Sequence, residues 1–155
     1  MIILGIDPGI TRIGFGVVES NGNNLSCLAY GILKNTGKGP GIYKDAADKV
    51  SKIINKYKPD AVAVEKLFFF KNQKTAIPVA QMRGVMLWAI ENSGLPFYEF
   101  TPLEIKSAIT NYGRAEKKQV QNMVRLILKI TTDIKPDDAA DALAIAVCCA
   151  SSVRG

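Results

Sequence analysis

Four acidic side chains stand at positions where the sequence favours the ends of strands or the start of a helix. Asp7 and Glu65 each follow a short apolar run that is typical of a buried strand. Asp138 and Asp141 are neighbours on one face of a helix, because residues three apart in a helix lie side by side. In an open α/β sheet, functional sites gather where strands end and loops diverge. We therefore expect these four carboxylates to meet at one edge of a sheet.

The chemistry that such a cluster favours is metal-assisted hydrolysis. Four carboxylates in one place repel one another, and a bound cation offsets this cost. Oxygen ligands without sulfur or imidazole suit Mg²⁺, with Mn²⁺ as a substitute. Two such ions about 4 Å apart stabilise the attacking and leaving oxygens of an in-line phosphoryl displacement. The sequence thus predicts a catalytic site with two metal ions, whose ligands are Asp7, Glu65, Asp138 and Asp141.

Structural roles for the same acids compete with this interpretation. Asp7 precedes Pro8 and Gly9 and could form a turn, and Asp137 suits the N-cap of a helix. Taken singly, each acid is more often structural than catalytic, but their joint placement favours a site. Helix geometry alone does not separate the pair Asp137/Asp141 from the pair Asp138/Asp141, because both lie within about 60° on the helical wheel.

The composition excludes several other classes of site. The chain of 155 residues contains no histidine, so histidine-based catalysis and histidine-ligated metals are excluded within one chain. The cysteines Cys27, Cys148 and Cys149 lack metal-ligand spacing, and we interpret them as buried apolar residues in a reducing compartment. The reduced cysteines favour a cytoplasmic protein. No apolar run approaches the length of a membrane helix, so we expect no membrane partner. The net charge of +6 is a weak indication of a polyanionic partner.

Apolar periodicity predicts one α/β domain over residues 1–155, with a five-stranded mixed sheet and helices on both faces. We expect a three-stranded antiparallel meander, followed by two parallel strands. We expect Thr75 to cap the second helix, with Pro78 in or near its first turn. The predicted strands are residues 2–6, 13–19, 25–33, 61–65 and 97–100, and the predicted helices are residues 42–57, 75–92, 116–130 and 136–147, with a short helix opening at 101–102.

Several stretches together resemble the RuvC-type Holliday junction resolvases. They occur in the order and at the spacing of that family and span almost the whole chain. Any one of them is weak, but together they are specific. They are residues 3–9 (ILGIDPG) with 11–14 (TRIG), 63–69 (AVEKLFF), 81–84 (QMRG), 113–120 (GRAEKKQV) and 138–144 (DAADALA).

This resemblance implies a ribonuclease-H-like fold and a homodimer that makes paired Mg²⁺-dependent cuts across four-way junction DNA, in recombination and repair. It carries the catalytic roles onto Asp7, Glu65, Asp138 and Asp141, so that Asp137 keeps its capping role. It also implies branch-migration proteins as partners.

Two groups of residues are predicted to contact DNA. In the first, aromatic rings between lysines suit base stacking, although the rings could equally cover the sheet or a dimer seam. The resemblance favours Phe68 over its neighbours. The second group lies around a predicted turn and could equally be a solvated helix face. The predicted DNA contacts are Phe68, Phe69, Lys71, Lys106, Arg114, Lys117 and Lys118; the resemblance carries a role near the active site onto Lys106 and Lys117.

The predicted helix around residues 79–90 is apolar on more than one face. One face could form a dimer interface, or the whole helix could be buried in the core. Two other functions fit the sequence less well. A non-catalytic module that recognises branched DNA would not need four convergent acids. An ATPase domain of the actin or sugar-kinase type also opens with a strand and an Asp-containing turn, but it needs a second, larger lobe.

Overall fold

The computed structural model describes residues 1–66 and 73–153 and contains a five-stranded mixed sheet. Its strands lie in the order β3-β2-β1-β4-β5. The first three are antiparallel, and β4 and β5 run parallel to β1. This topology confirms the predicted meander with two parallel strands. The bounds are β1 Ile2–Asp7, β2 Arg12–Asn21, β3 Asn24–Lys34, β4 Ala61–Glu65 and β5 Phe97–Phe100.

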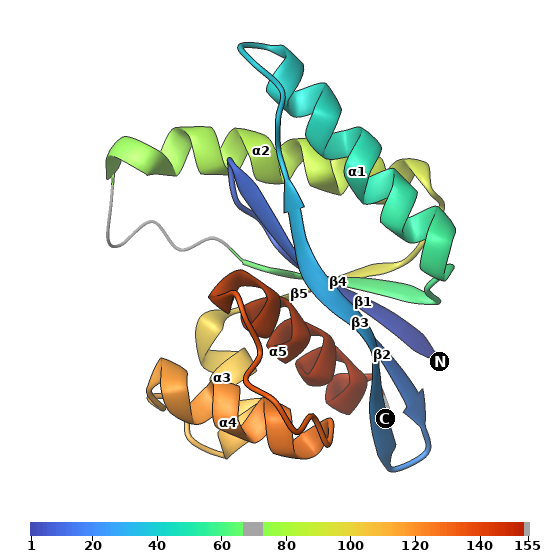
Figure 1. Cartoon of the computed structure of the whole chain (residues 1–155), viewed down its shortest axis with the longest axis vertical. Coiled ribbons are helices and arrows are strands. Elements are labelled where there is room, and N and C mark those ends of the chain that lie inside the picture. The colour runs from blue at the N-terminus through green and yellow to red at the C-terminus, as the bar shows by residue number, and fades with distance from the viewer. Residues whose placement is uncertain (67–72, 154–155) are drawn as a thin grey trace.

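Helices cover both faces of the sheet, as predicted. Helices α1 and α2 lie on one face, and α3, α4 and α5 lie on the other (Figure 1). None of the helices in residues 1–66 and 73–153 is long and apolar enough to cross a membrane. The bounds are α1 Gly41–Tyr57, α2 Gln73–Asn92, α3 Pro102–Thr110, α4 Lys117–Ile127 and α5 Asp137–Ser152.

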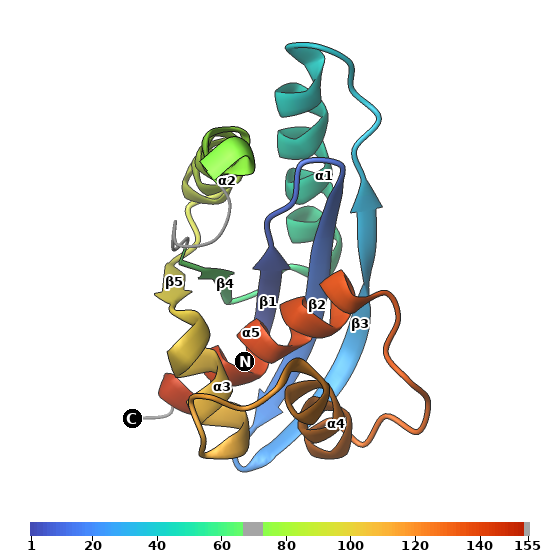
Figure 2. The same cartoon turned by 90° about the vertical axis from the view of Figure 1, so that its left-hand side faces the viewer.

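Strand alternation directs the first two acids toward one face. Ile6 and Val64 are buried in the core between the sheet and helices α1 and α2. Successive residues of a strand point to opposite faces. The next residues along β1 and β4, Asp7 and Glu65, therefore face the opposite side of the sheet. Helix α5 covers that side (Figure 2).

Helix α5 lies unusually close to the sheet because glycines of β1 and β2 face its backbone. A Cβ atom on Gly5 would stand 2.0 Å from the carbonyl oxygen of Ala142, and one on Gly14 would stand 2.0 Å from that of Asp138. No side chain fits at those distances. The small residues on the two elements thus bring the N-terminal turns of α5, which carry the acids, against the ends of β1 and β2.

Two predicted helix starts were wrong in detail. Helix α2 begins at Gln73, so Thr75 lies within the helix and is not its cap, and Pro78 lies inside the helix beyond the first turn. Gln and Lys are good helix formers, which allows the helix to extend toward the N-terminus despite the proline. In α5 the N-cap is Pro136, in an extended conformation, and Asp137 is the first helical residue with no side-chain capping bond. The predicted capping role of Asp137 was therefore wrong.

Two predicted helix ends also differ. Helix α4 ends at Ile127 and not at residue 130, because Lys129 adopts a left-handed conformation with φ of 54°. Helix α5 continues to Ser152, five residues beyond Val147. It remains buried through Ala150, so its apolar face packs on the sheet along nearly its whole length.

Replacing Gly14 with alanine should destabilise the fold. The added Cβ collides with the backbone of α5, and overpacking of this kind costs about 1–3 kcal/mol. The matched control is Gly41→Ala at the start of α1, where an added Cβ meets nothing within 4 Å. Chemical denaturation should show a lower free energy of unfolding for Gly14→Ala alone. Equal stability of Gly14→Ala and the unmodified chain would contradict the close packing of α5.

Candidate active site

Asp7 and Glu65 lie side by side at the ends of two neighbouring strands. Strands β1 and β4 pair in parallel with Ile6 opposite Val64, so the residues that follow them are also adjacent. Asp7 also stands opposite Gly14 in the pairing of β1 with β2. Both acids are partly buried.

Helix α5 adds two further acids to this place. Its backbone at Asp138 lies against Gly14, the residue that pairs with Asp7. Burial raises the pKa of Asp7 from 3.8 to about 8, and the negative charges of Asp141, Glu65 and Asp138 contribute to the rise. The contributions of these three charges place their carboxylates near Asp7. The structure thus brings together the four acids that the sequence singled out.

The pKa values of two other acids in the cluster are also raised. Burial raises the pKa of Glu65, and the charge of Asp141 adds to the effect. Burial likewise raises the pKa of Asp141, although its hydrogen bond with Lys117 opposes the rise. The cluster therefore holds more negative charge than its surroundings stabilise at neutral pH.

Basic side chains contact all three acids of α5. The Nζ of Lys117 donates a hydrogen bond to Asp141 Oδ2 at 2.8 Å and lies 3.6 Å from Asp137 Oδ2. The Nε of Arg12 lies 3.5 Å from Asp138 Oδ2. We did not predict Arg12 from the sequence. Its place on the hairpin that joins β1 to β2, close to the end of β1, is the signal that could have identified it.

Within residues 1–66 and 73–153, no three acidic or cysteine side chains form a ready-made metal-binding group. Two of the four acids are instead engaged by Lys117 and Arg12. The donor set nevertheless suits a hard divalent cation, because it consists of carboxylate oxygens that repel one another.

A pocket of about 220 Å³ adjoins the acids. Glu65 and Asp141 line it together with Lys106 and Lys117, above an apolar floor that includes Ile105. Helix α3, which carries Lys106, begins with a reciprocal capping box between Thr101 and Glu104. The cap fixes the start of α3 directly after β5, so Lys106 is held next to the end of the sheet.

Other predicted contacts fall into two groups. Arg114 and Lys118 are exposed near the start of α4, and their contact with DNA stays a prediction. Phe68, Phe69 and Lys71 lie outside the described residues, as does Phe70. Asp137 is largely exposed, with 68 % of its side-chain surface accessible, and it does not contribute to the pKa shift of Asp7. This arrangement favours Asp138 over Asp137 as a neighbour of Asp7.

Comparison with known proteins decides the family. The sequence model of the family described as crossover junction endodeoxyribonuclease RuvC matches residues 3–149. The chain belongs to the RuvC family. A RuvC family member from Petrotoga mobilis, named crossover junction endodeoxyribonuclease RuvC, is 49 % identical over 150 residues, which cover 96 % of this chain and 92 % of that protein.

Solved RuvC structures share the fold. The Thermus thermophilus RuvC structure aligns with a TM-score of 0.89 and 35 % identity, covering 99 % of this chain and 96 % of that one. A second structure, described as T. thermophilus RuvC in complex with Holliday junction substrate, aligns with a TM-score of 0.88 and 33 % identity over the same shares. The ribonuclease-H-like fold that the resemblance implied is confirmed.

The raised pKa of Asp7 predicts that stability falls as the pH rises. Between about pH 4 and pH 8 the folded chain holds a proton on Asp7 that the unfolded chain has released, so this contribution is full at low pH and lost near pH 8. In EDTA, the free energy of unfolding of Asp7→Asn should therefore decline less steeply from pH 5 to pH 9 than that of the unmodified chain. Asp133→Asn, at an exposed acid far along the sequence, serves as control and should keep the original slope. Parallel curves for all three proteins would show that Asp7 is an ordinary carboxylate.

Proposed function

We propose that this RuvC family member cuts four-way DNA junctions by hydrolysing phosphodiester bonds at the cluster of Asp7, Glu65, Asp138 and Asp141. The observation that carries the proposal is the convergence of these four acids at one end of the sheet, where burial, reinforced by the charges of the neighbouring acids, raises the pKa of Asp7 to about 8. The names of its relatives support the substrate class: one is a crossover junction endodeoxyribonuclease, and another was solved with a Holliday junction.

We infer that the four acids hold Mg²⁺, or Mn²⁺ in its place, with two ions in each site. When bound, such ions supply Lewis-acid stabilisation of the charge that develops on the phosphate oxygens. The protein's contribution is to keep the carboxylates partly buried and close together. Because Asp7 lies deepest among its acidic neighbours, its carboxylate gains most from a nearby cation.

When a cation binds the acids, the basic residues beside them would be free to contact the substrate. Lys117 bonds Asp141 in the structure, and a cation bound at Asp141 would release the Lys117 ammonium toward a phosphate. Lys106 lines the same pocket and offers a second positive charge. Contacts of this kind position the DNA backbone without reading its sequence.

Replacing Asp7 with asparagine should abolish cleavage while leaving junction binding intact, because the substitution removes a ligand charge and keeps the side-chain volume. The assay compares a synthetic four-way junction, a linear duplex and an RNA–DNA hybrid, each with Mg²⁺ and with EDTA. We expect the unmodified chain to cleave only the four-way junction, and only when Mg²⁺ is present. Gel-shift binding of Asp7→Asn to the junction shows that the variant still recognises its substrate. Cleavage by Asp7→Asn at the unmodified rate, or cleavage in EDTA, would refute the site.

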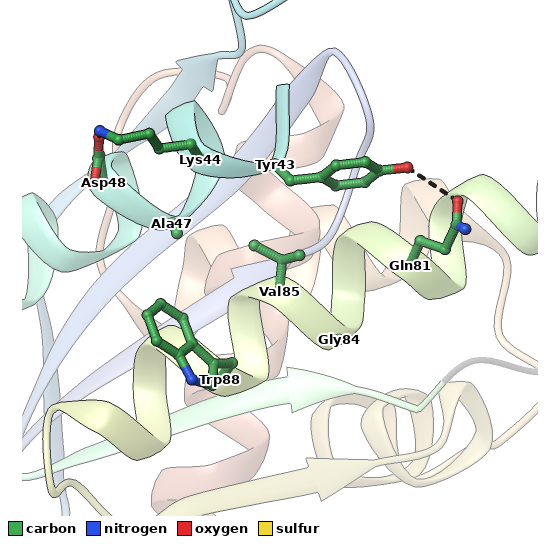
Figure 3. A pocket seen from close by; sticks show the side chains of 8 residues that line it. All are labelled: Tyr43, Lys44, Ala47, Asp48, Gln81, Gly84, Val85 and Trp88. Carbon is green, nitrogen blue, oxygen red and sulfur yellow. Dashed lines mark hydrogen bonds and ion pairs between the residues drawn. The ribbon is translucent and has the colours of Figure 1, made fainter. Parts of the chain in front are cut away.

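We further propose that the chain acts as a homodimer through the outer faces of α1 and α2. A groove of about 770 Å³ between these helices is lined by Tyr43, Ala47, Val85 and Trp88 (Figure 3). The hydroxyl of Tyr43 donates a hydrogen bond to Gln81 Oε1 at 2.9 Å and links the two helices at one end of the groove.

The exposed apolar side chains of α2 support this face as an interface. Trp88 is 61 % exposed and Ile77 is 69 % exposed, and the two lie within about 20° of each other on the helical wheel. Met82 and Met86, by contrast, are buried against the sheet. Helix α2 therefore has one apolar face for its own core and a second one directed outward.

We expect a second copy of this chain to occupy the groove, because the substrate requires two active sites. One chain offers one acidic cluster, whereas resolving a four-way junction takes two symmetric cuts. A two-fold dimer supplies two clusters to a substrate with matching symmetry. Large aromatic residues near the centre of an interface contribute most of its binding energy, which assigns that role to Trp88.

Trp88→Glu should shift the protein from dimer to monomer, because it places a charge in the apolar groove. Sedimentation at micromolar concentration measures the change. The control is Leu126→Glu, which substitutes an equally exposed apolar residue, 65 % accessible, on α4 at the opposite face. The control should remain dimeric. If Trp88→Glu sediments as the unmodified chain does, the interface lies elsewhere.

A further inference from the structure

The motif at residues 81–84 has one charged member that neither the core nor the groove accounts for. Gln81 and Gly84 line the groove between α1 and α2. Arg83 points the other way, and only 15 % of its side chain is accessible. A charged side chain so far from solvent needs specific partners, because an unpaired buried charge is strongly unfavourable.

The two partners of Arg83 belong to neighbouring strands, β4 and β5. Its Nε donates a hydrogen bond to the backbone carbonyl oxygen of Glu65 at 3.3 Å. Its Nη2 forms an ion pair with Glu99 Oε1. The guanidinium group thus holds two strands at once, which its planar fork of donors permits and a single lysine nitrogen does not.

The bond to Glu65 falls at the last residue of β4. The parallel pairing of β1 with β4 ends at Ile6 and Val64, one residue before Glu65. On the other side, β5 pairs Phe100 with Glu65, and the N–H of the next residue, Lys66, donates a hydrogen bond to the carbonyl oxygen of Phe100 at 2.8 Å. The peptide group after Glu65 is thus held at its N–H by β5 and at its carbonyl oxygen by Arg83, where pairing toward β1 has ended.

The orientation of a strand-end carboxylate depends on its own backbone. A tilt of the peptide after Glu65, whose carbonyl oxygen Arg83 holds, would move the side chain of Glu65 relative to Asp7 and Asp141. Groups that orient metal ligands without touching the metal commonly change metal affinity 10- to 100-fold when they are replaced. The contacts of Arg83 are of this kind.

We infer that Arg83, braced by Glu99, is a positioning residue that holds Glu65 in the orientation needed to bind a divalent cation, and that it connects helix α2 to the acidic cluster. This inference rests on the proposed metal site. It gives α2 two roles, since the helix that presents Trp88 outward also fixes a proposed metal ligand inward.

The test measures Mn²⁺ affinity by calorimetry, without DNA, in the full-length protein. The double variant Arg83→Met with Glu99→Gln removes both charges together, so the net charge near the cluster stays the same. The matched control is Arg125→Met with Asp133→Asn, which removes another ion pair between an arginine and an aspartate, on the far side of α4. Thermal unfolding of each protein establishes that it is folded at the temperature of the titration.

We expect the Arg83/Glu99 double variant to bind Mn²⁺ about tenfold more weakly or worse, and the control to bind as the unmodified chain does, whatever stability each has lost. If the double variant does not fold, Arg83→Lys decides. It keeps the charge and one partner, and it should still bind Mn²⁺ measurably more weakly. Unchanged affinity in the folded variants would overturn the inference. Failure of the unmodified chain to bind Mn²⁺ would instead overturn the proposed metal site.

Discussion

The constraint on which the whole arrangement depends is the close contact between helix α5 and strands β1 and β2. Gly5 and Gly14 leave no room for side chains, so the helix backbone rests on the strand backbone. This contact brings the acids of α5 to the end of β1, where burial and mutual repulsion raise the pKa of Asp7 to about 8. The fold therefore stabilises, through apolar packing of α5, a cluster of charges that is unfavourable in itself. Such local cost at a functional site is typical of enzymes.

The sequence was sufficient for the sheet and for the convergence of the acids, for identifiable reasons. The strands of the parallel pair are short, fully apolar and bounded by turns, so their ends were visible, and Asp7 and Glu65 stand at those ends. Residues three apart on a helix share a face by geometry alone, which paired Asp138 with Asp141. The resemblance to the RuvC family then separated Asp138 from Asp137, a distinction that helical spacing could not make. The structure favours the same choice, because Asp137 is largely exposed.

The contacts that could not be predicted from the sequence join elements that are far apart along the chain. Arg12 contacts Asp138 only because the β1–β2 hairpin lies beside the start of α5. Arg83 reaches Glu65 only because α2 crosses the end of β4, and nothing in its local pattern distinguishes it from an exposed arginine. The starts of α2 and α5 also differ from the prediction, because one favourable capping residue does not decide where a helix begins. Pro136, in an extended conformation, takes the N-cap position that the chemistry of Asp137 would have suited.

The central claim is that the four acids lie close enough for a cation to change their protonation. The most direct measurement is the pKa of the Asp7 carboxyl group, followed by carbon-13 NMR of the side chain with and without Mg²⁺. We expect a pKa near 8 without the ion. The pKa should fall by several units when Mg²⁺ is added, because the ion favours the charged form. Titration of Asp7 near the ordinary value of about 4 under both conditions would contradict it.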